Sequence, residues 1–435
     1  MVSKVESVNI LRNRGETLAI LVGGGPAPGI NGVIRSATIE AINNGLRVIG
    51  ILDGFKWLAR GDNSKVRELT IENVSRIHFE GGSILGTSRE NPTKSKEKLE
   101  NVIRALRNME VDFLITIGGD DTAYTANLID IETGPEIEVA HVPKTIDNDL
   151  PLPGTLSTFG YQTARHFGVE LVQNIMTDAQ TTSRWYFVVT MGRKAGHLAL
   201  GIGKAASATV TLVAEEFGDA PIKLDHICDI LEGSIIKRRS MGREDGVAIL
   251  AEGLAERLDP EDLQALDEVE RDDHGNIRIA EIPLGIILKH RVRRRLRERG
   301  IGVTIVDKNI GYELRCAPPI PYDCEYTQDL GHAAIRFLLS GDTGAMICIQ
   351  SGQLMPLYLS DMLDRQSGRT RVRMVDVDTE YFRVARKYQI RLETSDFENM
   401  KWLSRLARAG QLTLEEFSEK FGYLAEEHRR IIGIG

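Results

Sequence analysis

Two aspartates standing two residues apart follow an apolar run in the segment PKTIDNDL, residues 143–150. A hydroxyl that attacks phosphorus must lose its proton, and a carboxylate within hydrogen-bond reach can accept it, so Asp147 is a candidate general base. Lys144, three residues earlier, offers a compact positive charge that can hold a phosphate. The alternative is an Asx-type turn, for which Asp-Asn-Asp is equally suited.

A second acidic segment, GGDDT at residues 118–122, also follows an apolar run. Asp120 is typical of a Mg²⁺ ligand, because Mg²⁺ prefers carboxylate oxygens and keeps waters and phosphates as its other ligands. The alternative is that both acids merely stabilise a helix start through the macrodipole. Asp121 is harder to explain, since it adds negative charge where a phosphate should lie.

The glycine-rich segment GGGPAPGIN, residues 23–31, resembles an anion-binding turn. Glycines let the backbone approach an anion closely, and the helix expected after them offers free N–H groups. The chain contains no GxxxxGK[ST] motif, so this is not a Walker A loop. A plain strand-to-helix turn would also need glycines.

Arginines and one further acid follow later apolar runs. Arg184 opens one such run and Arg193 follows it, and bidentate arginines suit phosphates and developing phosphoryl charge, although surface ion pairs are their commoner fate. Glu252 could accept sugar hydroxyl protons, while Tyr312 and Arg315 could close over a phosphorylated ligand. Together these loops supply what phosphoryl transfer requires, because its catalysis rests on positioning and charge neutralisation.

The elements that must position these loops are apolar runs separated by helical patterns. Runs apolar on both faces indicate parallel strands covered by helices, and ligands bind at the carboxyl ends of such strands, where each motif lies. We therefore expect an α/β fold of two Rossmann-like three-layer α/β/α domains with mostly parallel sheets, plus a helical C-terminal region. Strands are predicted at 17–22, 47–52, 111–117, 137–142, 184–191, 246–251, 302–306 and 345–349.

Length and composition limit the class of protein. A chain of 435 residues is too long for one ordinary core and suggests two domains. It has no apolar run of about 18 residues and no apolar signal core, so we expect a cytoplasmic protein with no membrane partner. Four cysteines without CxxC spacing indicate free thiols. A net charge of −8 argues against a nucleic-acid partner.

The ordered set GGGPAPGIN, GGSILGTSR, GGDDT, PKTIDND, MGR, AEG and GYELR…PPIPYD resembles the phosphofructokinase family, from about residue 17 to residue 350. The resemblance implies two α/β domains with the site in the cleft between them. Residues 15–160 with about 313–375 would form the phosphate-donor domain. Residues 161–312, with a charged insertion near 256–280, would bind the sugar phosphate, and 376–435 would be a helical extension.

The resemblance also implies roles for individual residues. Asp147 takes the proton from the sugar 1-hydroxyl, Asp120 holds Mg²⁺, and Gly25 and Lys144 contact the donor. Lys144, Thr145 and Arg184 are the other implied catalytic residues. The implied substrate-binding residues are Thr145, Ile146, Asp147, Asp149, Arg89, Met191, Gly192, Arg193, Glu252, Tyr312, Glu313, Leu314 and Arg315.

Two positions indicate the donor. ATP-using members of the family have glycine where Asp121 and Lys144 stand, whereas pyrophosphate-using members have Asp and Lys. An aspartate beside an α-phosphate at ~4 Å costs about 4 kcal/mol at an effective dielectric of 20, roughly a thousandfold in affinity. Pyrophosphate has no α-phosphate. The resemblance therefore implies reversible transfer from pyrophosphate to fructose 6-phosphate, giving phosphate and fructose 1,6-bisphosphate, in glycolysis or gluconeogenesis.

Alternatives are an ATP-dependent 6-phosphofructokinase, a non-catalytic sugar-phosphate-sensing regulatory subunit, and an NAD or lipid kinase with a GGDG-type loop. The family's sugar-phosphate site borrows residues from a neighbouring subunit, so a homodimer or homotetramer is implied. Val306 stands where ATP-type members lend an arginine, with Lys308 nearby. Arg35 matches one arginine of a bacterial effector site but Ile39 replaces another, so we expect no nucleotide control of that type.

Overall fold

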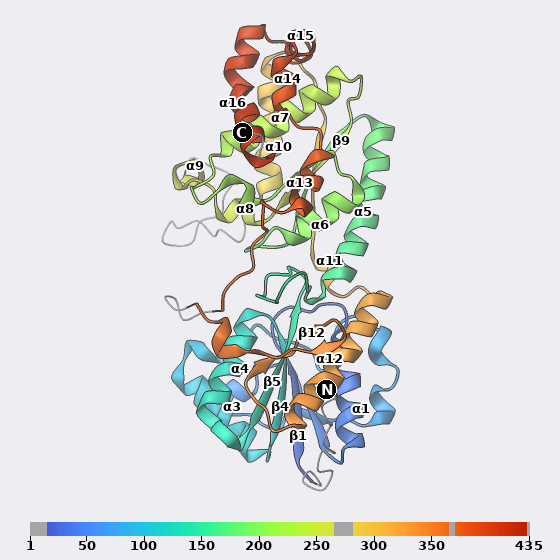
Figure 1. Ribbon diagram of the computed structural model, residues 1–435, viewed down its shortest axis with the longest axis vertical. Helices are drawn as coiled ribbons and strands as arrows, with labels where there is room; N and C mark the ends of the chain where they lie inside the picture. Colours follow the sequence, from blue (N-terminus) through green and yellow to red (C-terminus); the bar gives the residue numbers. More distant parts are fainter. Residues whose placement is uncertain (1–14, 265–281, 365–369, 433–435) are drawn as a thin grey trace, which may run out of the picture. The chain divides into compact units, whose positions relative to one another are not determined.

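The computed structural model describes residues 15–264, 282–364 and 370–432, which divide into two compact units (Figure 1). The first unit combines the chain up to Ala164 with Glu313–Arg373, and the second combines Arg165–Tyr312 with the chain from Met374 onward. Among the described helices, none has the length and hydropathy needed to cross a bilayer. Most of the charged insertion expected near 256–280 lies outside the described residues.

The sheet of the first unit has the strand order β14-β11-β5-β4-β1-β2-β3. Its central strands are parallel, and the edge strands β3 and β14 are antiparallel. Val22 pairs with Ile117, and Ile117 pairs with Val142, so the ends of β1, β4 and β5 meet at one edge. The bounds are β1 (Thr17–Val22), β2 (Arg47–Ile51), β3 (Val66–Glu68), β4 (Phe113–Gly118), β5 (Glu138–Thr145), β11 (Ala345–Met346) and β14 (Leu357–Tyr358); β6 (Phe159–Gly160) pairs with β5.

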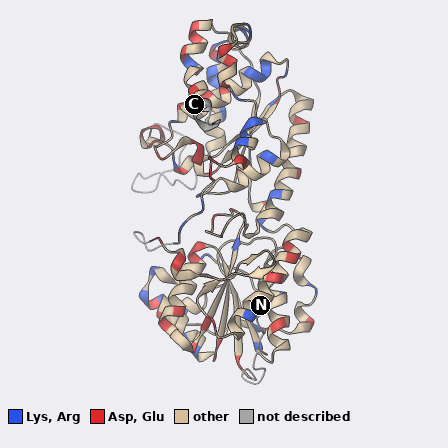
Figure 2. Cartoon of the chain, viewed as in Figure 1, with Lys and Arg blue, Asp and Glu red and all other residues tan. Residues whose placement is uncertain are grey.

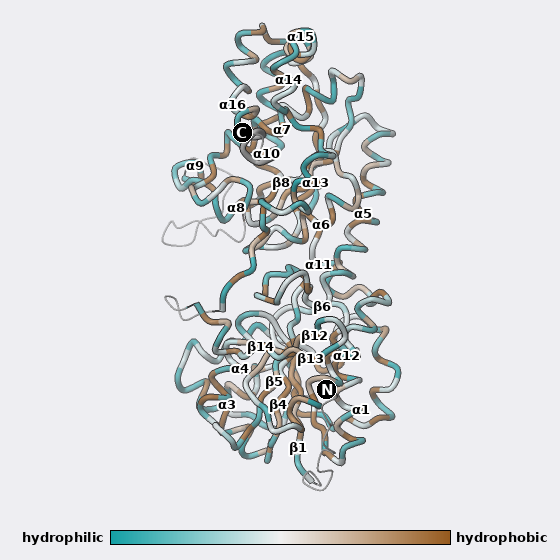
Figure 3. The backbone as a smooth tube through the Cα atoms, viewed as in Figure 1, coloured by the Kyte–Doolittle hydropathy of each residue, from teal (hydrophilic) through white to brown (hydrophobic). Residues whose placement is uncertain are grey.

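Helices cover both faces of this sheet because side chains alternate along each strand. Leu18 and Ile20 of β1 pack toward α1 (Ile30–Asn43) and α12 (Pro321–Leu339). Ala19 and Leu21 pack on the other face, in the core that α3 (Lys96–Asn108) and α4 (Asp120–Thr133) share. The tube in Figure 3 is accordingly hydrophobic along the strands and more hydrophilic along the helices.

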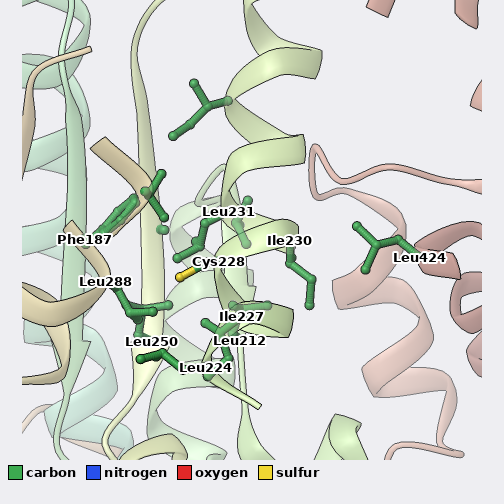
Figure 4. Close-up of a cluster of buried hydrophobic side chains, with 14 of the residues drawn as sticks. Phe187, Leu212, Leu224, Ile227, Cys228, Ile230, Leu231, Leu250, Leu288 and Leu424 are labelled. Carbon is green, nitrogen blue, oxygen red and sulfur yellow. The ribbon is translucent and has the colours of Figure 1, made fainter. Parts of the chain in front are cut away.

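The second unit is built on a parallel sheet in the order β10-β7-β9-β8. The bounds are β7 (Trp185–Thr190), β8 (Val210–Leu212), β9 (Gly246–Ala251) and β10 (Ile305–Ile310), with α6 (His197–Ala206), α7 (Leu224–Ser240), α8 (Gly253–Glu256), α9 (Pro260–Gln264) and α10 (Leu284–Glu298); α5 (Tyr161–Thr182) begins in the first unit. Figure 4 shows its core, where Phe187, Leu250 and Leu288 lie among side chains of α7. Charged side chains lie mainly on the helices (Figure 2).

The C-terminal helices belong to the second unit. They are α13 (Glu380–Lys387), α14 (Thr394–Glu398), α15 (Met400–Ala409) and α16 (Leu414–Ile432). Phe417 and Phe421 are fully buried in the same core as Phe187. The buried ammonium of Lys237 lies 2.7 Å from Asp396. The region is therefore helical as expected, and it completes a core that its polar sequence did not reveal.

The fold class expected from the sequence is confirmed, and the strands differ locally from those predicted. The strand expected at 302–306 runs instead over Ile305–Ile310, because β10 is an edge strand that tolerates polar residues such as Asp307. The run 345–349 divides into β11 and β12 (Ile349–Gln350), which pairs with β13 (Gln353–Leu354). The three-residue strand β8 was not predicted, since it is too short for a periodic signal.

Candidate active site

The glycine loop after β1 lies against the GGDDT loop after β4. The amide of Gly23 donates to Ile117 O at 2.9 Å, and that of Gly24 donates to Ser88 O at 2.8 Å. A Cβ at Gly23 or at Gly118 would overlap the side chain of Thr122. The two loops therefore pack through glycine backbone, and Thr122 fills the space that side chains would otherwise occupy.

The acids of GGDDT form the first turn of α4 at the carboxyl edge of the sheet. The amide of Asp121 donates to Oδ1 of its neighbour Asp120 at 2.9 Å. Both carboxyl groups line a pocket of about 180 Å³, which belongs to the first unit. Gly24, Phe55, Arg89 and Gly119 are also among its lining residues. Asp121 is exposed, so it is in position to repel an anion that enters this pocket.

A buried histidine, His141, holds the start of the GGDDT loop by hydrogen bonds. Nδ1 of His141 lies 2.8 Å from the Thr116 hydroxyl, and Nε2 lies 3.1 Å from Gly118 O. Burial lowers the pKa of His141 to about 3, so the ring is neutral. Since a carbonyl can only accept, Nε2–H donates to Gly118 O and Nδ1 accepts from Thr116. This position carried no signal that sequence reasoning detected.

Lys144 is the penultimate residue of β5, and its side chain is directed to the glycine loop. Its buried ammonium donates to the carbonyl oxygen of Gly25, and a Cβ at Gly24 would lie 3.3 Å from Nζ. Burial, and after it the charge of Arg315, lower the pKa of Lys144 to about 7, while Asp147 and Asp149 act in the opposite direction. The lysine is therefore surrounded by the charged groups that the sequence analysis selected.

Arg315 lies beside the glycine loop within the first unit. A Cβ at Gly25 would be 3.2 Å from Cζ of Arg315. Arg89 also lowers the pKa of Lys144, so three cationic groups share the neighbourhood of Gly25. Arg315 was predicted as a sugar-phosphate ligand, and the structure brings it to the loop predicted to contact the donor.

The loop that carries Asp147 is held by its own threonines and an asparagine. The Asp147 amide donates to Oγ1 of Thr145 at 3.0 Å. Oγ1 of Thr158 donates to Thr145 O at 2.7 Å, and the Thr158 amide donates to Oδ1 of Asn148 at 3.0 Å. Ile146 is only 4% exposed, so its side chain is buried and does not face a ligand.

In the second unit the segment MGR meets the ends of β9 and β10. The Gly192 amide donates to Glu252 at 3.2 Å, and Nε of Arg193 lies 3.5 Å from the other carboxylate oxygen. The Met191 amide donates to Ile310 O at 3.0 Å. Gly192 has φ 129, a conformation that favours glycine. The structure thus brings Met191, Gly192, Arg193 and Glu252 together.

Arg184 does not join this group. It precedes β7, whereas Met191 and Arg193 follow it, so β7 separates them by roughly 20 Å at about 3.3 Å per residue. Val306 pairs with Tyr186 near the same amino end of the sheet. Within one chain, Arg184 and Arg193 therefore lie at opposite ends of β7 in the second unit's sheet.

The short helix α11 (Tyr312–Arg315) follows β10. The side chain of Tyr312 is 74% exposed, and Glu313 is exposed as well. Leu314 is fully buried, so its side chain contributes to packing and not to ligand contact. Of the substrate-binding residues predicted here, the ones with reachable side chains are Tyr312, Glu313 and Arg315.

Asp120 and Asp121 are the carboxylates available to a metal at the donor loop. Among the described residues, no group of three or more His, Cys, Asp or Glu side chains is arranged to hold an ion. Mg²⁺ commonly uses one or two protein carboxylates and completes its coordination with waters and substrate phosphates. The two carboxylates therefore fit a Mg²⁺ ion that binds together with a phosphate ligand, and they do not form an all-protein metal site.

Comparison with known proteins matches the phosphofructokinase family profile to residues 17–338. A pyrophosphate--fructose 6-phosphate 1-phosphotransferase from Thermotoga maritima is 55% identical over 94% of this chain and 99% of its own. A protein of the same name from Naegleria fowleri is 50% identical over 94% of this chain and 96% of its own.

Among solved structures, the chain is similar to a pyrophosphate-dependent phosphofructokinase from Nitrosospira multiformis, with a TM-score of 0.65 and 18% identity. The match covers 86% of this chain and 90% of the other. At this identity the likeness concerns the fold.

Proposed function

Since the chain belongs to the phosphofructokinase family, we propose that it transfers a phosphoryl group from pyrophosphate to the 1-hydroxyl of fructose 6-phosphate. The products are fructose 1,6-bisphosphate and phosphate, and the reaction is reversible. The names of the two relatives at 55% and 50% identity support this donor. The structural observation that carries the proposal is the buried Lys144 beneath the glycine loop.

Lys144 and Asp121 act on the donor in opposite ways. The Lys144 ammonium lies against Gly24 and Gly25, where it neutralises charge as the phosphate leaves. Asp121 lines the pocket beside them and disfavours the additional phosphate of a nucleotide, by about 4 kcal/mol for two charges at ~4 Å and a dielectric of 20. Selectivity for pyrophosphate therefore comes from one attractive and one repulsive group.

Asp147 acts as the general base for the sugar hydroxyl. A bond forms between the sugar oxygen and the terminal phosphorus, the bridging P–O bond breaks, and phosphate leaves with that electron pair. The hydroxyl proton passes to the carboxylate of Asp147, whose loop Thr145 and Thr158 hold in place. In the reverse direction Asp147 returns this proton to the sugar oxygen.

Asp120 would hold Mg²⁺ at the donor loop. When bound, the ion neutralises the pyrophosphate oxygens and makes the terminal phosphorus easier to attack. The Gly118 carbonyl, which His141 fixes, and Thr122, which packs on Gly23, keep the start of α4 in register with the glycine loop. These residues orient Asp120 for that contact.

Residues 15–160 and about 313–375, which largely coincide with the first unit, serve as the donor domain, and the region 161–312 binds the sugar phosphate. There Arg193 provides positive charge for the phosphate, and Glu252 accepts hydrogen bonds from sugar hydroxyl groups. Because Arg184 lies at the opposite end of β7 from Arg193, it serves the site of a partner subunit, and the enzyme is a homodimer or homotetramer. The free state of Cys228, Cys316, Cys324 and Cys348 favours the cytoplasm.

A coupled assay tests the donor directly. The full chain is supplied with fructose 6-phosphate, Mg²⁺ and either pyrophosphate or ATP, and fructose 1,6-bisphosphate formation is measured. We expect turnover with pyrophosphate and little with ATP. Strong use of ATP alone would instead support an ATP-dependent enzyme, and inactivity with both donors would support a sugar-phosphate-sensing regulatory subunit.

A further inference from the structure

Arg373, far along the chain, donates several hydrogen bonds to the backbone of the loop that carries Asp147. Nε and Nη2 of Arg373 each donate to the carbonyl oxygen of Asn148 at 3.1 Å, and Nη2 also donates to the Asn148 side-chain oxygen. Nη1 donates to Leu156 O at 2.6 Å. The Arg373 amide donates to Asp149 O at 2.8 Å. All these groups lie in the first unit.

Asn148 is the residue between the two predicted aspartates, and its backbone is unusual. It has φ 57, in the left-handed region, which residues other than glycine adopt rarely and asparagine adopts more readily than most. Such a conformation persists where surrounding contacts over-determine it. Its carbonyl receives two bonds from Arg373, and its side-chain oxygen is shared by Arg373 and the Thr158 amide.

We propose that Arg373 is a positioning residue for phosphoryl transfer: its guanidinium holds Asn148 in the left-handed conformation and thereby aims the Asp147 carboxylate. This inference rests on the proposed function, in which Asp147 is the base. Asp147 precedes the Asn148 peptide and Asp149 follows it, so a change in that residue's φ and ψ redirects both acids. Arg373 acts through the loop and contacts no substrate.

The geometry requires arginine in particular. A planar guanidinium presents five donors in a fixed fork and can serve carbonyls on two sides at once, here Asn148 O and Leu156 O. A lysine ammonium at the end of a flexible stem supplies the same charge without that fork. The charge-conserving variant Arg373→Lys therefore separates positioning from simple electrostatics.

The test compares Arg373→Met and Arg373→Lys with Arg371→Met in the full chain. Arg371 is exposed and donates to Asp361 O at 2.7 Å, so its variant controls for loss of a nearby arginine that also bonds a carbonyl. We expect kcat to fall about 10- to 100-fold in both Arg373 variants, because misplacement of a reacting group by about 1 Å has effects of this size. KM for fructose 6-phosphate and pyrophosphate should change less than about threefold, and Arg371→Met should match wild type.

Hydrogen exchange supplies a readout that does not depend on activity. Arg373→Met should raise exchange at amides 147–158, and Arg371→Met should not. A kcat within about twofold of wild type, or unchanged exchange in this loop, overturns the proposal. If Arg373→Met does not fold, Arg373→Lys carries both measurements.

The same experiment keeps the two proposals apart. Wild-type turnover with pyrophosphate tests the proposed function before any variant is compared. Asp147→Asn, measured alongside, tests the base: full activity there removes Asp147 as the base. Loop exchange in the Arg373 variants still reports whether the arginine holds Asn148.

Discussion

The ammonium of Lys144 donates to the carbonyl oxygen of Gly25 and so ties the end of β5 to the loop after β1. A lysine that bonds a backbone carbonyl leaves its remaining N–H groups for an anion. The pair therefore places a positive charge beside Gly24, where a Cβ would lie 3.3 Å from Nζ.

Replacing Asp121 and Lys144, the two residues proposed to select pyrophosphate, should change which phosphate donor the enzyme uses. Asp121→Gly removes the repulsive charge from the pocket, and Lys144→Gly removes the ammonium that neutralises leaving phosphate. The double variant should gain ATP use and lose at least about tenfold in kcat/KM for pyrophosphate, since one charge contact is worth more than about 1.4 kcal/mol. Steady-state kinetics with both donors measure this. An unchanged donor preference would show that other residues set the selectivity.

Pyrophosphate binding should weaken as pH rises above 7. The pKa of Lys144 is lowered to about 7, chiefly by burial, and a bound anion raises it again. Below pH 7 the amine is charged with or without ligand, so affinity is insensitive to this group. Above pH 7 binding requires proton uptake, and affinity should fall by up to about tenfold per pH unit until the pKa of the complex is reached.

Calorimetry in two buffers of different ionisation enthalpy measures this proton uptake. Pyrophosphate itself titrates in this range, so the comparison is with Lys144→Met, which should lack the additional uptake at pH 8. Equal proton uptake in both proteins would contradict a titrating lysine.

Asp147→Asn should reduce kcat by several orders of magnitude while fructose 6-phosphate still binds. The amide retains the shape of the side chain but cannot accept the hydroxyl proton. Thr145 and Thr158 should keep the loop in place in the variant. Rapid-quench turnover and ligand binding by calorimetry give the two quantities, and near-normal turnover would assign the proton to another group.

Mixed oligomers should reveal whether Arg184 serves a partner. Arg184→Ala and Asp147→Asn should each be inactive, because each lacks one residue that the proposed site requires. Roughly the length of β7 separates Arg184 from Arg193 in one chain, which is why Arg184 is assigned to a partner's site. Refolding the two variants together should restore part of the activity, because some sites would then combine an intact Asp147 with a partner's intact arginine. No recovery, in oligomers shown to be mixed, would place both residues in one chain's site.

Glu252→Gln should weaken fructose 6-phosphate binding more than pyrophosphate binding. The glutamine keeps an oxygen for the Gly192 amide but loses the charge that faces Arg193. We expect KM for the sugar phosphate to rise about 10-fold, equivalent to about 1.4 kcal/mol, with KM for pyrophosphate unchanged. An equal rise for both substrates would mean that Glu252 supports the fold as a whole.

The parts of this molecule that the sequence predicts are those set by short-range patterns. Continuous apolar runs located β1, β4, β7 and β9, because buried parallel strands are apolar on both faces. The glycine and aspartate loops were found at the strand ends for the same reason. That these loops lie at the same end of the sheet follows from the register of the strands, which the hydrophobic pattern helps to set.

The residues that were missed act over long sequence separations. Arg373 bonds Asn148 across 225 positions, and no local pattern announces such a contact. His141 lies inside an apolar run, where its role depends on Thr116 in a neighbouring strand. Arg184 and Arg193 were grouped because they flank the same run, yet a strand separates its two ends. Local spacing does not show which edge of a sheet a residue occupies.

The order in which a ribosome makes this chain delays completion of the first unit. β11 pairs with β5, α12 packs on α1, and Arg315 and Arg373 complete the donor loops, yet all follow the sheet of the second unit in the sequence. Until residue 346 emerges, the edge of β5 has no β11 to cover it and can pair with other chains. This edge of the first sheet therefore stays uncovered while the whole second sheet is being made, from the synthesis of β5 until β11 emerges.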